Sequence, residues 1–223
     1  MHNQFYSDKG GQAKFIDLWR CWTPNQLPLL KGNLPRVMFL SAPSTGKTAL
    51  MEAKAFQCMQ IGLNVLFLLP FADDDKTKTL LTLKIQQQWQ DLKEKHQWQN
   101  EFHICSLKRK GLYRIDFEHF KELVQSEAFR DAAIFADELE VHDNDDLQAL
   151  TDIATMYEQR TIWLAITYIS NKNVTTEKVK SEFERHNFYI PELVNPIRNS
   201  KEIVKHSYPS IKGELTKYLR YWF

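Results

Sequence analysis

Short apolar runs alternate with longer amphipathic stretches along most of this 223-residue chain. Some of the short runs, such as those beginning at Asn64, Ala132 and Thr161, are apolar at both odd and even positions. Strands have this composition when helices cover both faces of a parallel sheet. The runs predict six strands, which are Arg36–Leu40, Asn64–Leu69, Phe102–Ser106, Ala132–Ala136, Thr161–Ile166 and Phe188–Val194.

The amphipathic stretches between these runs have apolar residues at helical spacing. They predict helices over Ala13–Trp22, Lys47–Gln60, Lys78–Trp98, Asp116–Phe129, Asp145–Glu158 and Thr176–His186. Strands that alternate with helices through right-handed crossovers form a doubly wound open sheet. The predicted fold is therefore α/β, with three αβα layers and a mostly parallel sheet.

The composition excludes several classes of protein. With 43% hydrophobic and 13% aromatic residues, the chain is neither disordered nor fibrous. The net charge of +1 gives no general argument for nucleic acid or an anionic membrane as a partner. Three scattered cysteines indicate neither a disulfide framework nor a zinc site. No targeting signal or membrane span is visible, so we expect an intracellular protein, cytoplasmic or nuclear.

The first predicted strand leads directly into the run Ser41-Ala42-Pro43-Ser44-Thr45-Gly46-Lys47-Thr48, and a predicted helix follows. Backbone N–H groups of such a loop, together with the helix N-terminus, attract phosphate groups. Lys47 is expected to contact the β- and γ-phosphates, and the Thr48 hydroxyl to ligate Mg²⁺. The pattern G-x-x-x-x-G-K-[ST] requires glycine at position 41, where this chain has Ser41. A chance Gly-Lys-Thr at a helix start is the alternative.

A second candidate element follows the buried strand Ala132–Ala136, which we expect to end at Asp137-Glu138. In a nucleotide hydrolase, an aspartate here holds Mg²⁺ and the adjacent glutamate polarises the attacking water. An acidic turn after a strand would show the same residues, because further acids follow closely. The position of the pair downstream of a phosphate loop favours the functional interpretation.

Together these motifs resemble Walker A and DE-type Walker B elements of P-loop NTPases, and more narrowly the first RecA-like domain of superfamily 1 helicases. Thr23-Pro24-Asn25-Gln26 is similar to that family's Q-motif, which implies that Gln26 reads the adenine edge. The run Leu193–Ser200 resembles motif IV, which implies that Arg198 senses the γ-phosphate. Thr167, after another buried strand, would be a polar sensor. Gln26 as a loop residue and Arg198 as a sheet-edge cap remain alternatives.

The resemblance implies an N-terminal helical extension (1–22), a RecA-like nucleotide-binding domain (23–187) and a C-terminal strand and helices (188–223) that begin an absent second domain. It also implies ATP and Mg²⁺ as ligands, and slow hydrolysis unless a second RecA-like domain or partner protein supplies a further charge. Two other interpretations stay open: a nucleotide-regulated switch without significant turnover, and a degenerate loop that binds no nucleotide.

Single-stranded nucleic acid is a further candidate partner. Lys108-Arg109-Lys110, with Tyr113 and Arg114, could form a basic patch with an aromatic ring for stacking. A solvated charge run in a loop is the alternative.

Overall fold

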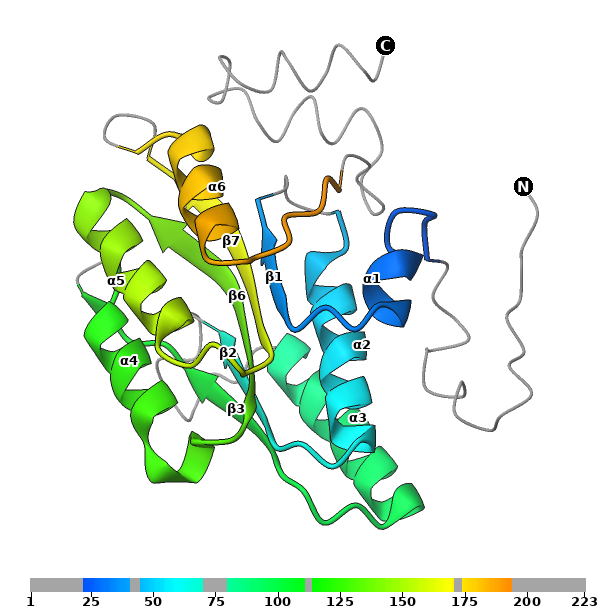
Figure 1. Cartoon of the computed structure of the whole chain (residues 1–223). Coiled ribbons are helices and arrows are strands. Elements are labelled where there is room, and N and C mark those ends of the chain that lie inside the picture. The colour runs from blue at the N-terminus through cyan, green and yellow to red at the C-terminus, as the bar shows by residue number, and fades with distance from the viewer. Residues whose placement is uncertain (1–21, 41–44, 70–79, 111–113, 171–173, 194–223) are drawn as a thin grey trace.

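The computed structural model describes residues 22–40, 45–69, 80–110, 114–170 and 174–193 (Figure 1). Its helices are α1 (Leu27–Lys31), α2 (Lys47–Gln60), α3 (Leu80–His96), α4 (Phe117–Gln125), the 3₁₀ turn Glu127–Phe129, α5 (Asn144–Thr155) and α6 (Thr176–Arg185). Its strands are β1 (Arg36–Phe39), β2 (Val65–Leu69), β3 (Phe102–Ser106), β4 (Arg109–Lys110), β5 (Arg114–Ile115), β6 (Ala133–Val141) and β7 (Ile162–Ile169).

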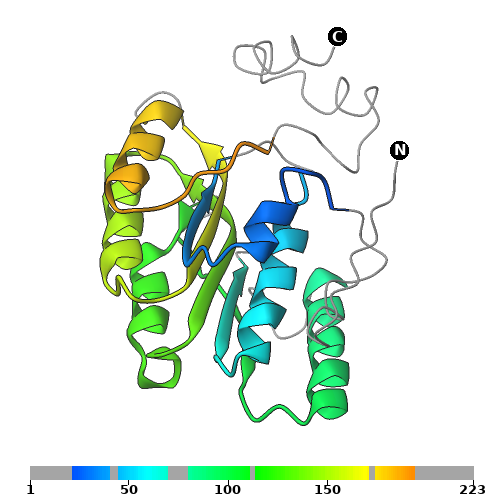
Figure 2. The same ribbon diagram turned by 45° about the vertical axis from the view of Figure 1, so that its right-hand side comes forward.

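Five strands form one parallel sheet in the order β1-β7-β6-β2-β3. β4 and β5 form a separate antiparallel hairpin. Helices α1, α2 and α3 cover one face of the sheet, and α4, α5 and α6 cover the other (Figure 2). The predicted α/β fold with a mostly parallel, doubly covered sheet is confirmed.

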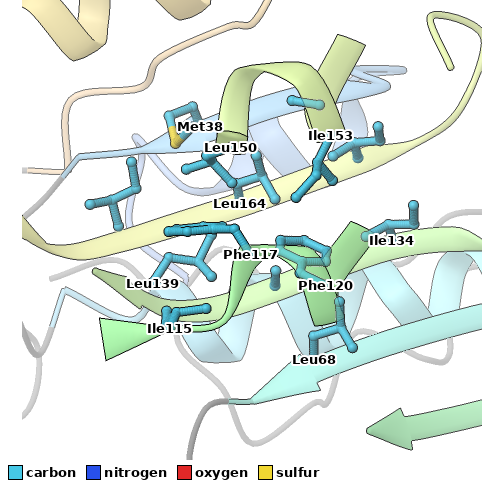
Figure 3. Close-up of a cluster of buried hydrophobic side chains, with 14 of the residues drawn as sticks. Met38, Leu68, Ile115, Phe117, Phe120, Ile134, Leu139, Leu150, Ile153 and Leu164 are labelled. Carbon is cyan, nitrogen blue, oxygen red and sulfur yellow. The ribbon is translucent and has the colours of Figure 1, made fainter. Parts of the chain in front are cut away.

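Strand side chains alternate between two cores because successive residues of a strand face opposite sides of a sheet. In β1, Val37 and Phe39 pack with α2 and α3, whereas Met38 packs with α4 and α5. Figure 3 shows the second core, in which Phe120 of α4 and Leu150 of α5 meet the sheet. Every residue of β1 and β2 is buried, which explains why these strands are apolar at both parities.

The sixth predicted strand, Phe188–Val194, is wrong over the described residues. Only Tyr189 bridges to β1, opposite Val37, through the hydrogen bonds Met38 N–H to Tyr189 O and Tyr189 N–H to Arg36 O, both 3.0 Å. Pro191 follows two residues later and has no N–H to donate, so a ladder cannot continue through it.

Two strands are longer than predicted. β6 continues past Ala136 to Val141, and β7 continues past Ile166 to Ile169, so neither strand ends at its candidate polar residue. The prediction that β6 ends in Asp137-Glu138 is therefore wrong: the pair lies inside the strand. The extensions pair with each other, Glu140 opposite Tyr168 and Val141 opposite Ile169.

The remaining predicted elements agree with the structure within a few residues, apart from the helix over Ala13–Trp22. That helix lies outside the described residues except for Trp22, which is not helical. The short helix α1 and the hairpin β4–β5 were not predicted. No helix among the described residues is both long and apolar enough to cross a membrane.

Candidate functional site

The N-terminus of α2 begins at Lys47 and is preceded by Gly46, whose φ of 84° is in the left-handed region. Glycine adopts this conformation without the steric cost that a Cβ brings. The Gly46 carbonyl accepts the N–H of Leu50, which closes the first turn of the helix. The predicted phosphate-loop residues Ser41, Ala42, Pro43 and Ser44 lie outside the described residues.

The two candidate motifs meet in space. The Thr48 hydroxyl donates a hydrogen bond of 2.5 Å to Oδ2 of Asp137, although the residues are 89 positions apart in the chain. Asp137 is completely buried. Burial raises the pKa of its carboxyl to about 6, against the hydrogen bond from Thr48, which lowers it. A buried carboxylate therefore faces the start of α2.

Asp137 and Glu138 lie where β6 is irregular. The pairing of β6 with β7 shifts register between Ala136 and Leu139, so these two residues have no ladder partners on β7. Glu138 has a φ of 56°, in the left-handed region, and its N–H donates to Oδ1 of Asp137 at 2.9 Å. Bulges re-aim side chains and are frequent beside active sites, and strained residues persist where the surrounding structure fixes them.

Lys47 completes the group of charges at this end of the sheet. Its side chain is buried, and burial lowers the pKa of the ammonium group. The charges of Asp137 and Glu138 act in the opposite direction and raise it. A lysine and two carboxylates are thus electrostatically coupled between the start of α2 and the irregular middle of β6.

Gln26 lies beside this group, at the start of α1, and is only 1% exposed. Its Oε1 accepts the N–H of Thr23 at 3.0 Å, and its Nε2 donates to the carbonyl of Thr45 at 3.0 Å. The helix α1, which follows Gln26, was not predicted from the sequence. Pro28, in the first turn of α1, was the available signal, because proline is favoured there.

Thr167 lies within β7, and its Oγ1 donates to the carbonyl of Leu139 in the extension of β6, at 3.5 Å. No contact between Thr167 and the Lys47–Asp137 group is part of the described structure. Arg198 lies outside the described residues. The proposed roles of both residues stay predictions.

The basic run is a hairpin rather than a loop, and acidic side chains pair with it. Arg109 contacts Glu140 on the β6 extension at 3.5 Å, and Lys110 contacts Asp116 at 3.1 Å. Arg114 contacts the N-terminal residues of α5: Asp143 at 2.5 Å and Asp146 at 2.8 Å. Tyr113 lies outside the described residues. The hairpin therefore links the end of β6 to α5.

The sheet topology explains why these groups lie together. The connection after β1 crosses the face that carries α2, whereas the connection after β7 crosses the opposite face. Adjacent strands whose connections leave in opposite directions open a crevice at their carboxyl ends, where open α/β sheets bind ligands. Gly46, Lys47 and Thr48 lie at this position.

The donor set fits a magnesium ion that is held partly by substrate. Among the described residues, no three His, Cys, Asp or Glu side chains converge as a cage of protein ligands. Mg²⁺ instead keeps several waters and binds through one or two carboxylates together with substrate phosphates. Thr48 and Asp137 offer a hydroxyl and a carboxylate beside Lys47.

A groove of about 480 Å³ runs beside α1. It is lined by Pro24, Asn25, Pro28, Leu29, Leu34, Tyr189, Ile190, Pro191 and Glu192. Gln26 is not among these residues.

No protein-family model matches the chain, and no curated protein matches it either.

Proposed function

We propose that this chain is a P-loop nucleoside triphosphatase domain of helicase-like type, which binds Mg-ATP and hydrolyses it slowly by itself. The observation that carries the proposal is the contact between Thr48 and Asp137. Two motifs chosen for their chemistry alone, 89 residues apart, meet at the carboxyl end of the sheet beside a buried lysine.

Each side chain has a role that suits its environment. Lys47 and the N–H groups at the start of α2 would bind the phosphates, since a buried cation attracts them more strongly than an exposed one. Thr48 and Asp137 would hold Mg²⁺, which supplies neutralising charge to the phosphates. Glu138 would orient the attacking water, and its left-handed backbone sets the direction of its side chain. Arg198 and Thr167 are proposed sensors of the γ-phosphate.

Slow turnover is proposed because an arginine supplied by another domain or partner typically adds 10³–10⁵ in rate in related systems. A second RecA-like domain or a partner protein would provide it here. Single-stranded nucleic acid stays a possible partner, but the ion pairs of Arg109, Lys110 and Arg114 make the basic hairpin a poorer candidate for its binding surface.

A nucleotide-regulated switch is the second candidate, and one observation favours it. Glu138 and Glu140 lie two residues apart on β6, in the part whose pairing with β7 is irregular, and Glu140 pairs with Arg109 of the hairpin. A change at Glu138 on nucleotide binding could therefore reach the hairpin surface over two residues. In this case binding would occur with negligible turnover.

The test compares wild type with Lys47→Ala and Glu138→Gln by calorimetry with Mg-ATP, thermal unfolding and phosphate release. Lys180→Ala, an exposed lysine on α6, is the matched control. Wild type should bind, and ATP at 100 times its Kd should add about 2.7 kcal/mol of stability. Lys47→Ala should abolish binding, whereas Glu138→Gln should bind and lose turnover.

Binding without phosphate release in wild type would favour the switch. Absence of Mg-dependent binding in wild type, or equal binding by Lys47→Ala, would contradict the nucleotide site itself. The degenerate-loop interpretation would then hold.

A further inference from the structure

We propose that Gln26 is a positioning residue that fixes the Thr45–Gly46 peptide at the entry to α2, and that it does not read the nucleotide base. The inference rests on the proposed function, and it departs from the adenine-reading role that the sequence resemblance implies for this residue. The juxtaposition that carries it is the hydrogen bond from the Gln26 amide to the carbonyl of Thr45.

Both polar atoms of the Gln26 side-chain amide form a hydrogen bond with the protein backbone. The oxygen accepts from Thr23 N–H and the nitrogen donates to Thr45 O, each at 3.0 Å. Only 1% of the residue is exposed. Each polar atom keeps one further hydrogen-bonding position, but at this exposure a base could reach it only after the packing around the amide had moved.

The lining of the groove beside α1 also indicates that a ligand does not contact the Gln26 amide. Asn25, in the turn before α1, and Pro28, in its first turn, line the groove. Gln26 does not line it, and its side chain lies on the side of Thr45 instead. A ligand that enters the groove meets the neighbours of Gln26 rather than its amide.

The bond to Thr45 has a consequence for phosphate binding because a peptide unit is planar and trans. Holding the carbonyl of Thr45 fixes the plane of the Thr45–Gly46 peptide, and with it the direction of the Gly46 N–H. That N–H lies at the entry to α2, where phosphate loops donate backbone hydrogen bonds. Thr45 is itself buried, so water does not compete for this carbonyl.

This arrangement predicts weak selection of the base. Binding sites that hydrogen-bond a polar group of the substrate reject analogues by 10⁴–10⁵, whereas sites that merely enclose it discriminate weakly. With Gln26 occupied, we expect wild type to prefer Mg-ATP over Mg-GTP by less than about tenfold. We also expect it to bind inorganic tripolyphosphate, which has no base.

The test measures the affinities of wild type, Gln26→Ala and Gln26→Glu for Mg-ATP, Mg-GTP and Mg-tripolyphosphate by calorimetry. Gln26→Glu keeps an acceptor for Thr23 N–H and, at a pH at which it is ionised, cannot donate to Thr45 O. Both variants should lose affinity for all three ligands by the same factor, about tenfold for one hydrogen bond. Gln148→Ala, an exposed glutamine on α5, should change none of them.

Thermal unfolding without ligand separates positioning from a merely structural role, which would lower the melting temperature and leave the affinity of the folded protein unchanged. A loss of ATP affinity with unchanged tripolyphosphate affinity would overturn the proposal, as would a wild-type preference for ATP over GTP above a hundredfold. If wild type bound none of the three ligands, the proposed function would fail, and this inference with it.

Discussion

Buried charged side chains have different partners at the two ends of the sheet. At the amino end, Arg36 donates to the carbonyls of Ala154 (2.7 Å) and Glu158 (3.4 Å), at and beyond the end of α5. Arg160 donates to the carbonyls of Val124 (3.2 Å) and Phe129 (2.9 Å), around the end of α4. Both cations satisfy carbonyls that a helix C-terminus leaves without intrahelical partners.

At the carboxyl end, the charges of Lys47, Asp137 and Glu138 act on one another. Asp137 has its pKa raised by burial, Lys47 has its pKa lowered by burial, and Glu138 has a left-handed backbone. Each of these features costs stability. The comparison teaches that burial of charge alone does not mark a site, because burial lowers the pKa of Arg36 and Arg160 just as it lowers that of Lys47. What distinguishes the carboxyl end is a buried carboxylate coupled to a buried lysine.

The largest expected effect is at the amino end. Arg160→Met keeps the aliphatic part of the side chain but removes the donor to the buried Val124 carbonyl and one of the two donors to the Phe129 carbonyl, so it should lower the free energy of unfolding by about 3 kcal/mol. Nucleotide affinity of the folded protein should not change. Urea unfolding and calorimetry check both parts, and a stability loss below about 1 kcal/mol would break the comparison.

The next effect is at Asp137, and it should have the opposite sign. Between about pH 4 and 6 the folded protein keeps the proton of Asp137, whereas the unfolded chain, with an ordinary pKa near 3.8, has released it. Stability from this group is therefore complete below about pH 4 and lost as the pH rises to about 6. Asp137→Asn should raise the free energy of unfolding at pH 7 by about 2–3 kcal/mol in the absence of Mg²⁺ and nucleotide.

Urea unfolding of both proteins between pH 3.5 and 8 measures this effect. The informative quantity is the difference between wild type and Asp137→Asn at each pH, since other carboxyls such as that of Asp143 have lowered pKa values and give the opposite slope. A constant difference across this range would contradict the prediction.

A smaller effect concerns the backbone of Glu138. A left-handed conformation costs a non-glycine residue about 1–2 kcal/mol, and glycine avoids this cost. Glu138→Gly should therefore be more stable than Glu138→Ala by about 1 kcal/mol, although both lack the carboxylate. Equal stabilities would show that the backbone at this position is not strained.

The smallest effect on stability is expected at the β4–β5 hairpin, whose ion pairs are separate from the buried charges at the two ends of the sheet. Arg114→Ala removes contacts with Asp143 and Asp146, but its side chain is 46% exposed. Ion pairs of this kind contribute little, so stability should fall by less than about 1 kcal/mol. A loss of more than about 2 kcal/mol in the free energy of unfolding would mean that the ion pairs of the hairpin stabilise the fold as much as the buried arginines of the amino end do.

The fold could be predicted because it depends on the strongest signal in the sequence, the alternation of buried strands with amphipathic helices. The contact of Thr48 with Asp137 followed from the same signal, since Thr48 comes after one buried parallel strand and Asp137 after the apolar run of another, although β6 continues beyond it. The extension of β6 had a weaker signal: Leu139 and Val141 are buried while Glu138 and Glu140 are half-buried, which is the alternation of a strand with one covered face.

Other features have no local signal. The left-handed φ of Glu138 follows from a register shift between two strands, which no single segment encodes. The occupied amide of Gln26 depends on the fold of Thr45, 19 residues later. The run after Phe188 has strand-like composition, and Pro191 limits it to one bridge.

The position of β1 has a consequence for the order in which the molecule is assembled. In the described structure its neighbours are β7 on one side and Tyr189 on the other, both more than a hundred residues later in the chain. At a synthesis rate of about 5–20 residues per second, β1 waits on the order of ten seconds for its partners. Contacts of such long range also slow refolding, because the chain loses the entropy of a long loop before the contacts that close it stabilise the structure. We therefore expect β1 and the start of α2 to be among the last parts of the chain to become ordered.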